Sequence, residues 1–134
     1  MYNIYMKHLA IFSGNLAEDI LSGKKTVESR FSRAKIAPFG AISSGDLVYI
    51  KPSGGDIIGQ FRVQKVISIE GLEISDLETI KKRYGNQILA DESFWQAHQN
   101  AKYATLIFIG TTTKFITSPI TYAKKDLRGW VVLG

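Results

Sequence analysis

Residues 47–69 read LVYIKPSGGDIIGQFRVQKVISI, and this stretch decides the fold. From residue 57 to residue 69 apolar side chains alternate with polar ones, the pattern of a β-strand with one buried and one wet face. Residues 47–51 predict a second strand, and residues 53–56, Ser-Gly-Gly-Asp, supply a turn that tolerates positive φ. Together they predict a β-hairpin.

Helix signals lie on both sides of this hairpin. Asn15 is followed three residues later by Glu18, which predicts a helix start, and Gly23 predicts its end. Ser75 and Glu78 form a second capping pattern, for a helix that is expected to end at Gly85. A third helix is predicted over residues 91–100.

Further strands are predicted over residues 9–12, 103–109, 114–116 and 130–133, and residues 25–31 can also be extended. Five or six mostly antiparallel strands with about three short helices indicate an α+β fold, a small and partly closed β-barrel with the helices on its outside.

Length and composition fit one domain, residues 1–134. Hydrophobic residues make up 45% of the chain and charged residues 22%, both near globular averages. The chain has no cysteine, which excludes disulfides, thiolate zinc sites and a cysteine nucleophile. No apolar run approaches the roughly 20 residues of a membrane span, and no secretory signal begins the chain, so a cytoplasmic protein without membrane contact is expected. The net charge of +5 favours an anionic partner.

Much of this charge lies in residues 23–35, GKKTVESRFSRAK, which hold five basic residues and one acid. If this segment is extended, Thr26, Glu28 and Arg30 share one face and Lys25 lies on the other. Arg30 can then hold a phosphate or a base edge, with Glu28 accepting from an amino group or orienting the arginine. The alternative is a solvated edge that carries a surface ion pair.

The spacing Gly-x-Lys-x-x-Glu-x-Arg after a short helix, here Gly23, Lys25, Glu28 and Arg30, resembles the signature of the ASCH family, whose fold is PUA-like. The likeness continues through residues 44–46, 94–95 and 126–133. This resemblance implies a PUA-like barrel with a cleft beside the signature, and RNA or a nucleoside or nucleotide as the partner.

Some small ASCH members are hydrolases, so the resemblance also implies an alternative: an amidohydrolase acting on acetylated cytidine, or a ribonuclease. The amidohydrolase pattern uses the signature lysine, a threonine three residues later and a downstream carboxylate. Lys25 matches the lysine, but Glu28 stands at the threonine position. Asp91 or Glu92 can supply the carboxylate, and either can equally cap a helix. Lys25 and Glu28 are the catalytic candidates, with Glu28 as a general base or as an orienting group.

The predicted ligand-binding residues are mostly basic or aromatic. They are Lys25, Thr26, Glu28, Arg30, Arg33, Phe39 and Lys51, with Asp91, Glu92 and Arg128 as weaker candidates. Phe39 lies in a loop after Pro38 and can stack on a base or fill a core pocket. Lys124, Lys125 and Arg128 form a second basic group. No metal-ligand spacing occurs and no cofactor is expected.

Two other readings of the chain stay open. His8 and His98, the only histidines, can form a two-histidine ribonuclease site if the fold brings them together. Alternatively, the basic strip of residues 23–35 binds an acidic protein surface and the domain catalyses nothing.

Overall fold

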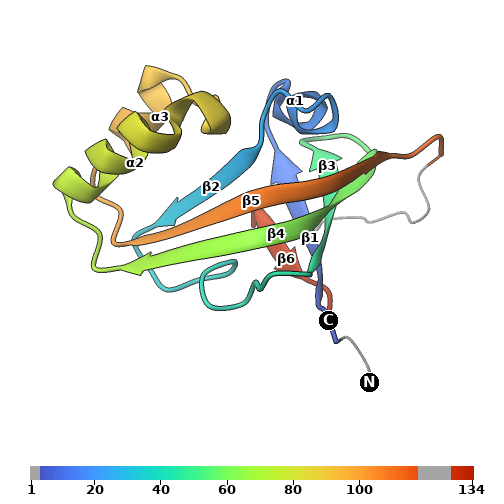
Figure 1. Ribbon diagram of the computed structural model, residues 1–134, viewed down its shortest axis with the longest axis horizontal. Coiled ribbons are helices and arrows are strands. Elements are labelled where there is room, and N and C mark those ends of the chain that lie inside the picture. Colours follow the sequence, from blue (N-terminus) through green and yellow to red (C-terminus); the bar gives the residue numbers. More distant parts are fainter. Residues whose placement is uncertain (1–3, 118–127) are drawn as a thin grey trace.

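The computed structural model describes residues 4–117 and 128–134 (Figure 1). This part of the chain forms six strands and three helices. In chain order they are β1 (Lys7–Phe12), α1 (Leu16–Leu21), β2 (Val27–Ser32), β3 (Leu47–Pro52), β4 (Gly59–Glu70), α2 (Ile74–Ile88), α3 (Glu92–Ala97), β5 (Tyr103–Lys114) and β6 (Trp130–Val132). No helix of the described residues is long and apolar enough to span a membrane.

All six strands belong to one sheet in the order β2-β5-β4-β3-β1-β6. Every neighbouring pair is antiparallel except β1 and β3, which run parallel. The sheet curls until its two edge strands, β2 and β6, approach each other. A hydrogen bond spans the remaining gap, from Arg30 on β2 to the carbonyl of Gly129, the residue immediately before β6. The predicted fold, a partly closed and mostly antiparallel barrel with helices outside it, is therefore confirmed.

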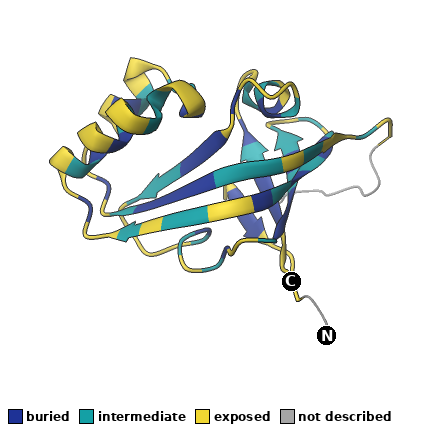
Figure 2. Ribbon diagram, in the orientation of Figure 1, coloured by how far each residue is buried: buried dark blue, intermediate teal, exposed yellow. Residues whose placement is uncertain are grey.

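Two hydrophobic clusters hold the sheet and the helices together. The first packs α1 against the sheet and includes Phe12, Phe61 and Trp130. The second packs α2 and α3 against β2 and β5 and includes Val27 and Leu106. Figure 2 shows the buried residues concentrated in the strands, whereas the outer faces of α2 and α3 are exposed. Strand β2 begins beside α1 and runs below α2 and α3 (Figure 1), and its Val27 belongs to the second cluster.

The hairpin expected from residues 47–69 is present. Strands β3 and β4 pair antiparallel, with Leu47 opposite Arg62 and Ile50 opposite Gly59. Strand β4 begins two residues later than expected, because the chain from residue 53 to residue 58 forms the turn and its exit.

The boundaries predicted for α2 are wrong at both ends. The backbone N–H of Glu73 donates to the Asp76 carboxylate at 2.9 Å, so the helix begins at Ile74 and Ser75 lies inside it. At the other end the helix passes through Gly85, because Ile88 continues its buried face into the second cluster. The helix ends only at Leu89, which adopts a left-handed φ of 59°.

The prediction of two strands over residues 103–109 and 114–116 is also wrong, because β5 continues through Lys114. Its pairing with β4 shifts register near Phe61 and Val63. At this irregularity Gly110 lies so close to β4 that a Cβ there would stand 2.9 Å from the Arg62 carbonyl oxygen. A glycine that resembles a turn signal in the sequence is therefore required by a close backbone approach within the strand.

Candidate functional site

Three charged side chains converge at the start of β2. Glu28 lies between two cations: its Oε1 is 3.3 Å from Lys25 Nζ, and its Oε2 is 2.9 Å from Arg30 Nη2. Lys25 is 2% exposed and Glu28 is 5% exposed, whereas Arg30 is partly exposed. We call these three residues the β2 network.

Both carboxylate oxygens of Glu28 are fully engaged. Oε1 accepts from the Ser29 backbone N–H at 3.0 Å and also contacts Lys25. Oε2 accepts from Nε and Nη2 of Arg30. A carboxylate has about four acceptor positions, so no lone pair remains for taking a proton from water. This geometry favours the orienting role of Glu28 over that of a general base.

Lys25 is held from three directions. Its ammonium donates to the Ile88 carbonyl at the end of α2 and contacts the Glu28 carboxylate. Its backbone N–H donates to the backbone carbonyl of Asp19 in α1 at 2.9 Å. An ammonium has three N–H groups. Two have these partners among the described residues, the third has none there, and Lys25 lines a cavity.

A cleft follows β2 between α1 and the connection of α2 to α3. It consists of two adjacent hollows of about 300 Å³ and 290 Å³, which share five lining residues. The first reaches Lys25 and residues 88–91, and the second reaches Arg30, Phe31 and His98. The shared residues are Ser13, Leu16, Glu28, Ser29 and Phe94. We call this cavity the β2 cleft.

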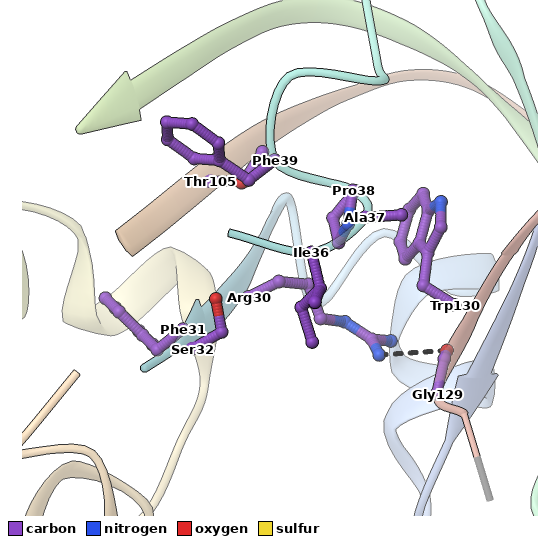
Figure 3. Close-up of a pocket in the computed structure, with 10 residues that line it drawn as sticks. All are labelled: Arg30, Phe31, Ser32, Ile36, Ala37, Pro38, Phe39, Thr105, Gly129 and Trp130. Atoms are coloured by element: carbon purple, nitrogen blue, oxygen red, sulfur yellow. Dashed lines mark hydrogen bonds between the residues drawn. The ribbon is translucent and has the colours of Figure 1, made fainter. Parts of the chain in front are cut away.

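Arg30 closes the open side of the barrel beyond this cleft. It donates to the carbonyls of Ile11, at 3.0 Å, and Gly129, at 3.1 Å, and its guanidinium lies 5.2 Å from the ring centroids of Phe12 and Trp130. Figure 3 shows the side chain extending from β2 toward Gly129. A smaller hollow of about 190 Å³, the seam pocket, lies here and is also lined by Ile36, Phe39 and Thr105.

Phe39 and Arg128 lie on the seam side of Arg30. Phe39 lines the seam pocket and packs edge-on against Tyr103, with ring centroids 5.0 Å apart. Arg128 is exposed and immediately precedes Gly129. Lys124 and Lys125, the rest of the second basic group, lie outside the described residues, as does the start of the 126–133 segment.

Three predicted ligand-binding residues stand apart from the cavities. Thr26 is exposed, and its backbone N–H donates to Gln87. Arg33 is exposed beyond the end of β2, and Lys51 lies on β3. None of the three lines the β2 cleft or the seam pocket.

The two downstream carboxylates differ in position. Asp91 lines the β2 cleft and caps α3, where it accepts from the Phe94 backbone N–H at 2.9 Å. Hydrogen bonds from the Ser93 hydroxyl and from this N–H lower the pKa of Asp91. Glu92 is exposed, pairs with Lys81 and does not line the cleft.

The histidines lie in different clusters. His8 is fully buried on β1, where its Nε2 is 2.8 Å from Asp46 Oδ2 and its Nδ1 accepts from the Trp130 indole N–H at 3.0 Å. An indole nitrogen only donates, so Nε2 carries the proton that His8 donates to Asp46. His98 instead donates from Nδ1 to the Phe94 carbonyl and lines the β2 cleft. We call His8, Asp46 and Trp130 the His8 network.

The Asp46 carboxylate is the acceptor at the centre of the His8 network. It also accepts from the backbone N–H groups of Met6 and Ser43, each at 3.0 Å. Burial acts to raise the pKa of Asp46, but hydrogen bonds from His8, Met6 and Ser43, together with the nearby imidazole, lower it below its ordinary value.

Several cleft residues carry no signal in the sequence. Ser13 and Leu16 come from the loop and first turn of α1, and residues 88–90 come from the end of α2. Nothing in the local pattern relates these segments to Lys25, which is 63 residues from its partner Ile88. Ser29 lies within the quoted signature, but only its surroundings in the fold distinguish it from its neighbours.

A curled, six-stranded and mostly antiparallel sheet with helices outside it is the fold of the PUA-like class of small barrel domains, and here a cleft lies beside the Lys-x-x-Glu-x-Arg segment. The model of the ASCH domain matches residues 15–111, and the chain belongs to this family, which is associated with RNA binding.

Solved structures with the same fold come from Zymomonas mobilis. The crystal structure of its ASCH protein is 20% identical, with a TM-score of 0.63 over 81% of this chain and 69% of that chain. A serine-to-alanine mutant of that protein is 17% identical, with a TM-score of 0.72 over 96% of this chain and 88% of that chain. At these identities the likeness shows the fold. No curated protein matches the sequence.

Proposed function

We propose that this domain binds single-stranded RNA or a nucleotide in the β2 cleft, with Lys25 as the central charged contact. One observation carries the proposal: a lysine that is 2% exposed lines a cavity of about 300 Å³, and its ammonium has two partners among the described residues for three N–H groups. Burying a cation is costly unless it is paired, and Glu28 and the Ile88 carbonyl supply that pairing. They also fix the direction of the ammonium, which preorganises it for an acceptor on a ligand.

The size and lining of the cleft fit one unstacked base. The hollow beside Lys25, about 300 Å³, is at the lower end for small-molecule sites, which admits a nucleoside-sized group and excludes a duplex. Phe94 and Leu16 supply apolar surface against which a base can pack. Glu28 pairs with the ammonium through one oxygen and with Arg30 through the other, and Arg33, exposed beyond β2, is a further cation for a phosphate outside the cleft.

The test is a titration of isotope-labelled protein with the four nucleoside monophosphates and with a short single-stranded RNA, followed by amide chemical shifts. Shifts are expected at residues 25–31 and 88–94. Replacing Lys25 by Met removes a charged donor and keeps most of the apolar stem, so the affinity should fall about tenfold or more.

Lys24→Met is the matched control, because it removes the same charge from the neighbouring exposed position. It should change the affinity less than threefold. The amide spectra of both variants show whether each is folded. Binding that is equal in wild type and Lys25→Met, or lost equally in both variants, contradicts a site centred on Lys25.

Hydrolysis of acetylated cytidine or of RNA is the second candidate, because the free N–H of Lys25 can stabilise an oxyanion that develops in the cleft. Product signals in the same samples measure it. Turnover that Lys25→Met abolishes and Lys24→Met retains would establish a hydrolase, whereas binding without product would leave a binding module.

A further inference from the structure

Ser29 is the one side chain with an orphaned buried polar atom in the described part of the chain. The residue is 3% exposed, and its Oγ has no hydrogen-bond partner there. Ser29 lies at the middle of the β2 cleft, since it lines both of the hollows that make up the cleft.

No hydrogen bond within the described residues engages this hydroxyl. Buried polar groups are nearly always hydrogen-bonded, and an unpaired hydroxyl carries a desolvation cost. The other serine side chain on β2, Ser32, donates to the Ala34 carbonyl at 2.7 Å, so the strand is able to satisfy a hydroxyl. The Ser29 hydroxyl therefore lacks a partner because of where it lies in the cleft, and not because it lies on β2.

The surroundings of Ser29 define the group that would satisfy it. Its backbone N–H and the Lys25 ammonium bind the same oxygen of Glu28, which places the Ser29 backbone nitrogen within two hydrogen-bond lengths of the ammonium, and both residues line the same hollow. Glu28 has no lone pair left for a ligand, so the groups that this part of the cleft offers are donors: the third N–H of Lys25 and the hydroxyl of Ser29. The complementary ligand group is an acceptor oxygen.

We propose that Ser29 is a specificity-determining residue of the β2 cleft, whose hydroxyl donates to an acceptor oxygen of the bound ligand beside Lys25. The inference rests on the function proposed above and assigns its chemistry: the ligand presents a base carbonyl or a phosphate oxygen to the floor of the cleft. Glu28 only orients the donor groups of the cleft, so its carboxylate does not bind the amino groups of a base.

The decisive experiment compares the stability and the ligand affinity of Ser29→Ala. Removing an unpaired hydroxyl should leave the melting temperature of the free protein equal to or above that of the wild type. The same change should weaken binding about fivefold to tenfold, because the ligand then loses a buried donor. A residue with a merely structural role would lower the melting temperature and leave the affinity unchanged.

Two ligands distinguish the sources of the oxygen. Uridine presents base carbonyl oxygens without a phosphate, and inorganic phosphate presents phosphate oxygens without a base. Weaker binding of uridine by Ser29→Ala assigns the contact to the base, and weaker binding of phosphate assigns it to the phosphate. Ser32→Ala, on the same strand but with a satisfied hydroxyl, should affect neither affinity by more than twofold.

A second variant tests access to the position. The chain has no cysteine, so Ser29→Cys introduces its only thiol. A small methanethiosulfonate reagent should label this thiol in the folded protein, and uridine monophosphate or RNA should slow the labelling at least fivefold. Labelling that the ligand does not slow would overturn the inference.

The outcomes separate this inference from the proposed function. If no nucleotide or RNA binds the wild type, the proposed function fails and the role of Ser29 fails with it. If ligands bind and Lys25→Met weakens them while Ser29→Ala does not, the proposed function stands and the role of Ser29 alone is overturned.

Discussion

The described part of the chain contains two buried polar networks of similar size, and they differ in how much of their hydrogen-bonding capacity is used. In the His8 network, both imidazole nitrogens and the indole N–H have partners, and the Asp46 carboxylate accepts from three donors. In the β2 network, Lys25 keeps an N–H for the cavity it lines and Ser29 beside it keeps a hydroxyl. Burial of polar groups alone therefore does not identify a site. The unused hydrogen-bonding capacity next to a cavity is what distinguishes the β2 network from the His8 network, and the proposed site rests on that difference.

The two networks also hold different parts of the fold together. The His8 network connects β1, the turn before β3 and the residue that begins β6, so it fixes the two ends of the described chain to each other. The β2 network connects the edge strand to the end of α2 and, through Arg30, to β1 and Gly129. Arg30 joins the networks, because its guanidinium packs on the Trp130 ring.

The largest effect is expected when Glu28 is removed. Glu28→Ala leaves Lys25 buried without its counter-ion and removes the carboxylate that orients Arg30, so the free energy of unfolding should fall by about 3–5 kcal/mol. Urea unfolding followed by tryptophan fluorescence measures this change.

The matched control for Glu28→Ala is Glu70→Ala. Glu70 pairs with Lys35 at 3.9 Å, and both side chains are largely exposed. Its removal should change the unfolding free energy by less than about 1 kcal/mol. If Glu28→Ala costs no more than this control, the β2 network is not a buried ion pair in solution.

An intermediate effect is expected in the His8 network. Asp46→Asn weakens the hydrogen bonds from His8, Met6 and Ser43, which should lower the unfolding free energy at neutral pH by about 1–3 kcal/mol. The affinity of the β2 cleft for nucleotides should change less than twofold, because Asp46 does not line it. A large loss of binding would show that the two networks are not separate in function.

The same variant should show a pH signature. The pKa of Asp46 is below its ordinary value of 3.8 in the folded protein, so the unfolded chain takes up the proton at a higher pH than the folded one does. The stability that this carboxylate contributes is thus present above about pH 4 and is lost as the pH falls through the folded pKa. The wild type should lose stability over this acidic range more steeply than Asp46→Asn, as measured by urea unfolding at a series of pH values.

The sequence predicts the elements better than it predicts their boundaries. Alternation in residues 57–69 and the capping position of Asp91 are local patterns, and both correspond to the structure. The end of α2 at Leu89 and the continuity of β5 through Gly110 depend on packing against distant segments. The local sequence signals therefore predicted a wrong helix end and a wrong strand boundary.

A similar division applies to the candidate site. The charge spacing singles out Lys25, Glu28 and Arg30, and the structure brings these three together. Thr26, predicted to share a polar row with Glu28, is exposed outside the cleft, because regular pairing of β2 begins only at Val27. The importance of Ser29 follows from the absence of a partner for its hydroxyl among the described residues, which no linear pattern contains.

The smallest effect is expected at the contact that joins the two networks. A Cβ at residue 129 would stand 3.1 Å from Arg30 Nη1, so in Gly129→Ala the guanidinium must move by a few tenths of an ångström. The unfolding free energy should fall by less than about 1 kcal/mol, because the flexible arginine can give way. The indole N–H resonance of Trp130 should nevertheless shift, since the moved guanidinium packs on that ring.

Gly55→Ala is the control for this change, because its Cβ meets only ordinary contacts with Pro52 at 3.5 Å. It should leave the Trp130 resonance in place. Nucleotide affinity in Gly129→Ala should stay within about threefold of wild type, because Glu28 still holds Lys25 through its other oxygen. If the affinity instead falls as far as in Lys25→Met, the orientation of the Lys25 ammonium depends on Arg30. The seam pocket and the β2 cleft then act as one site.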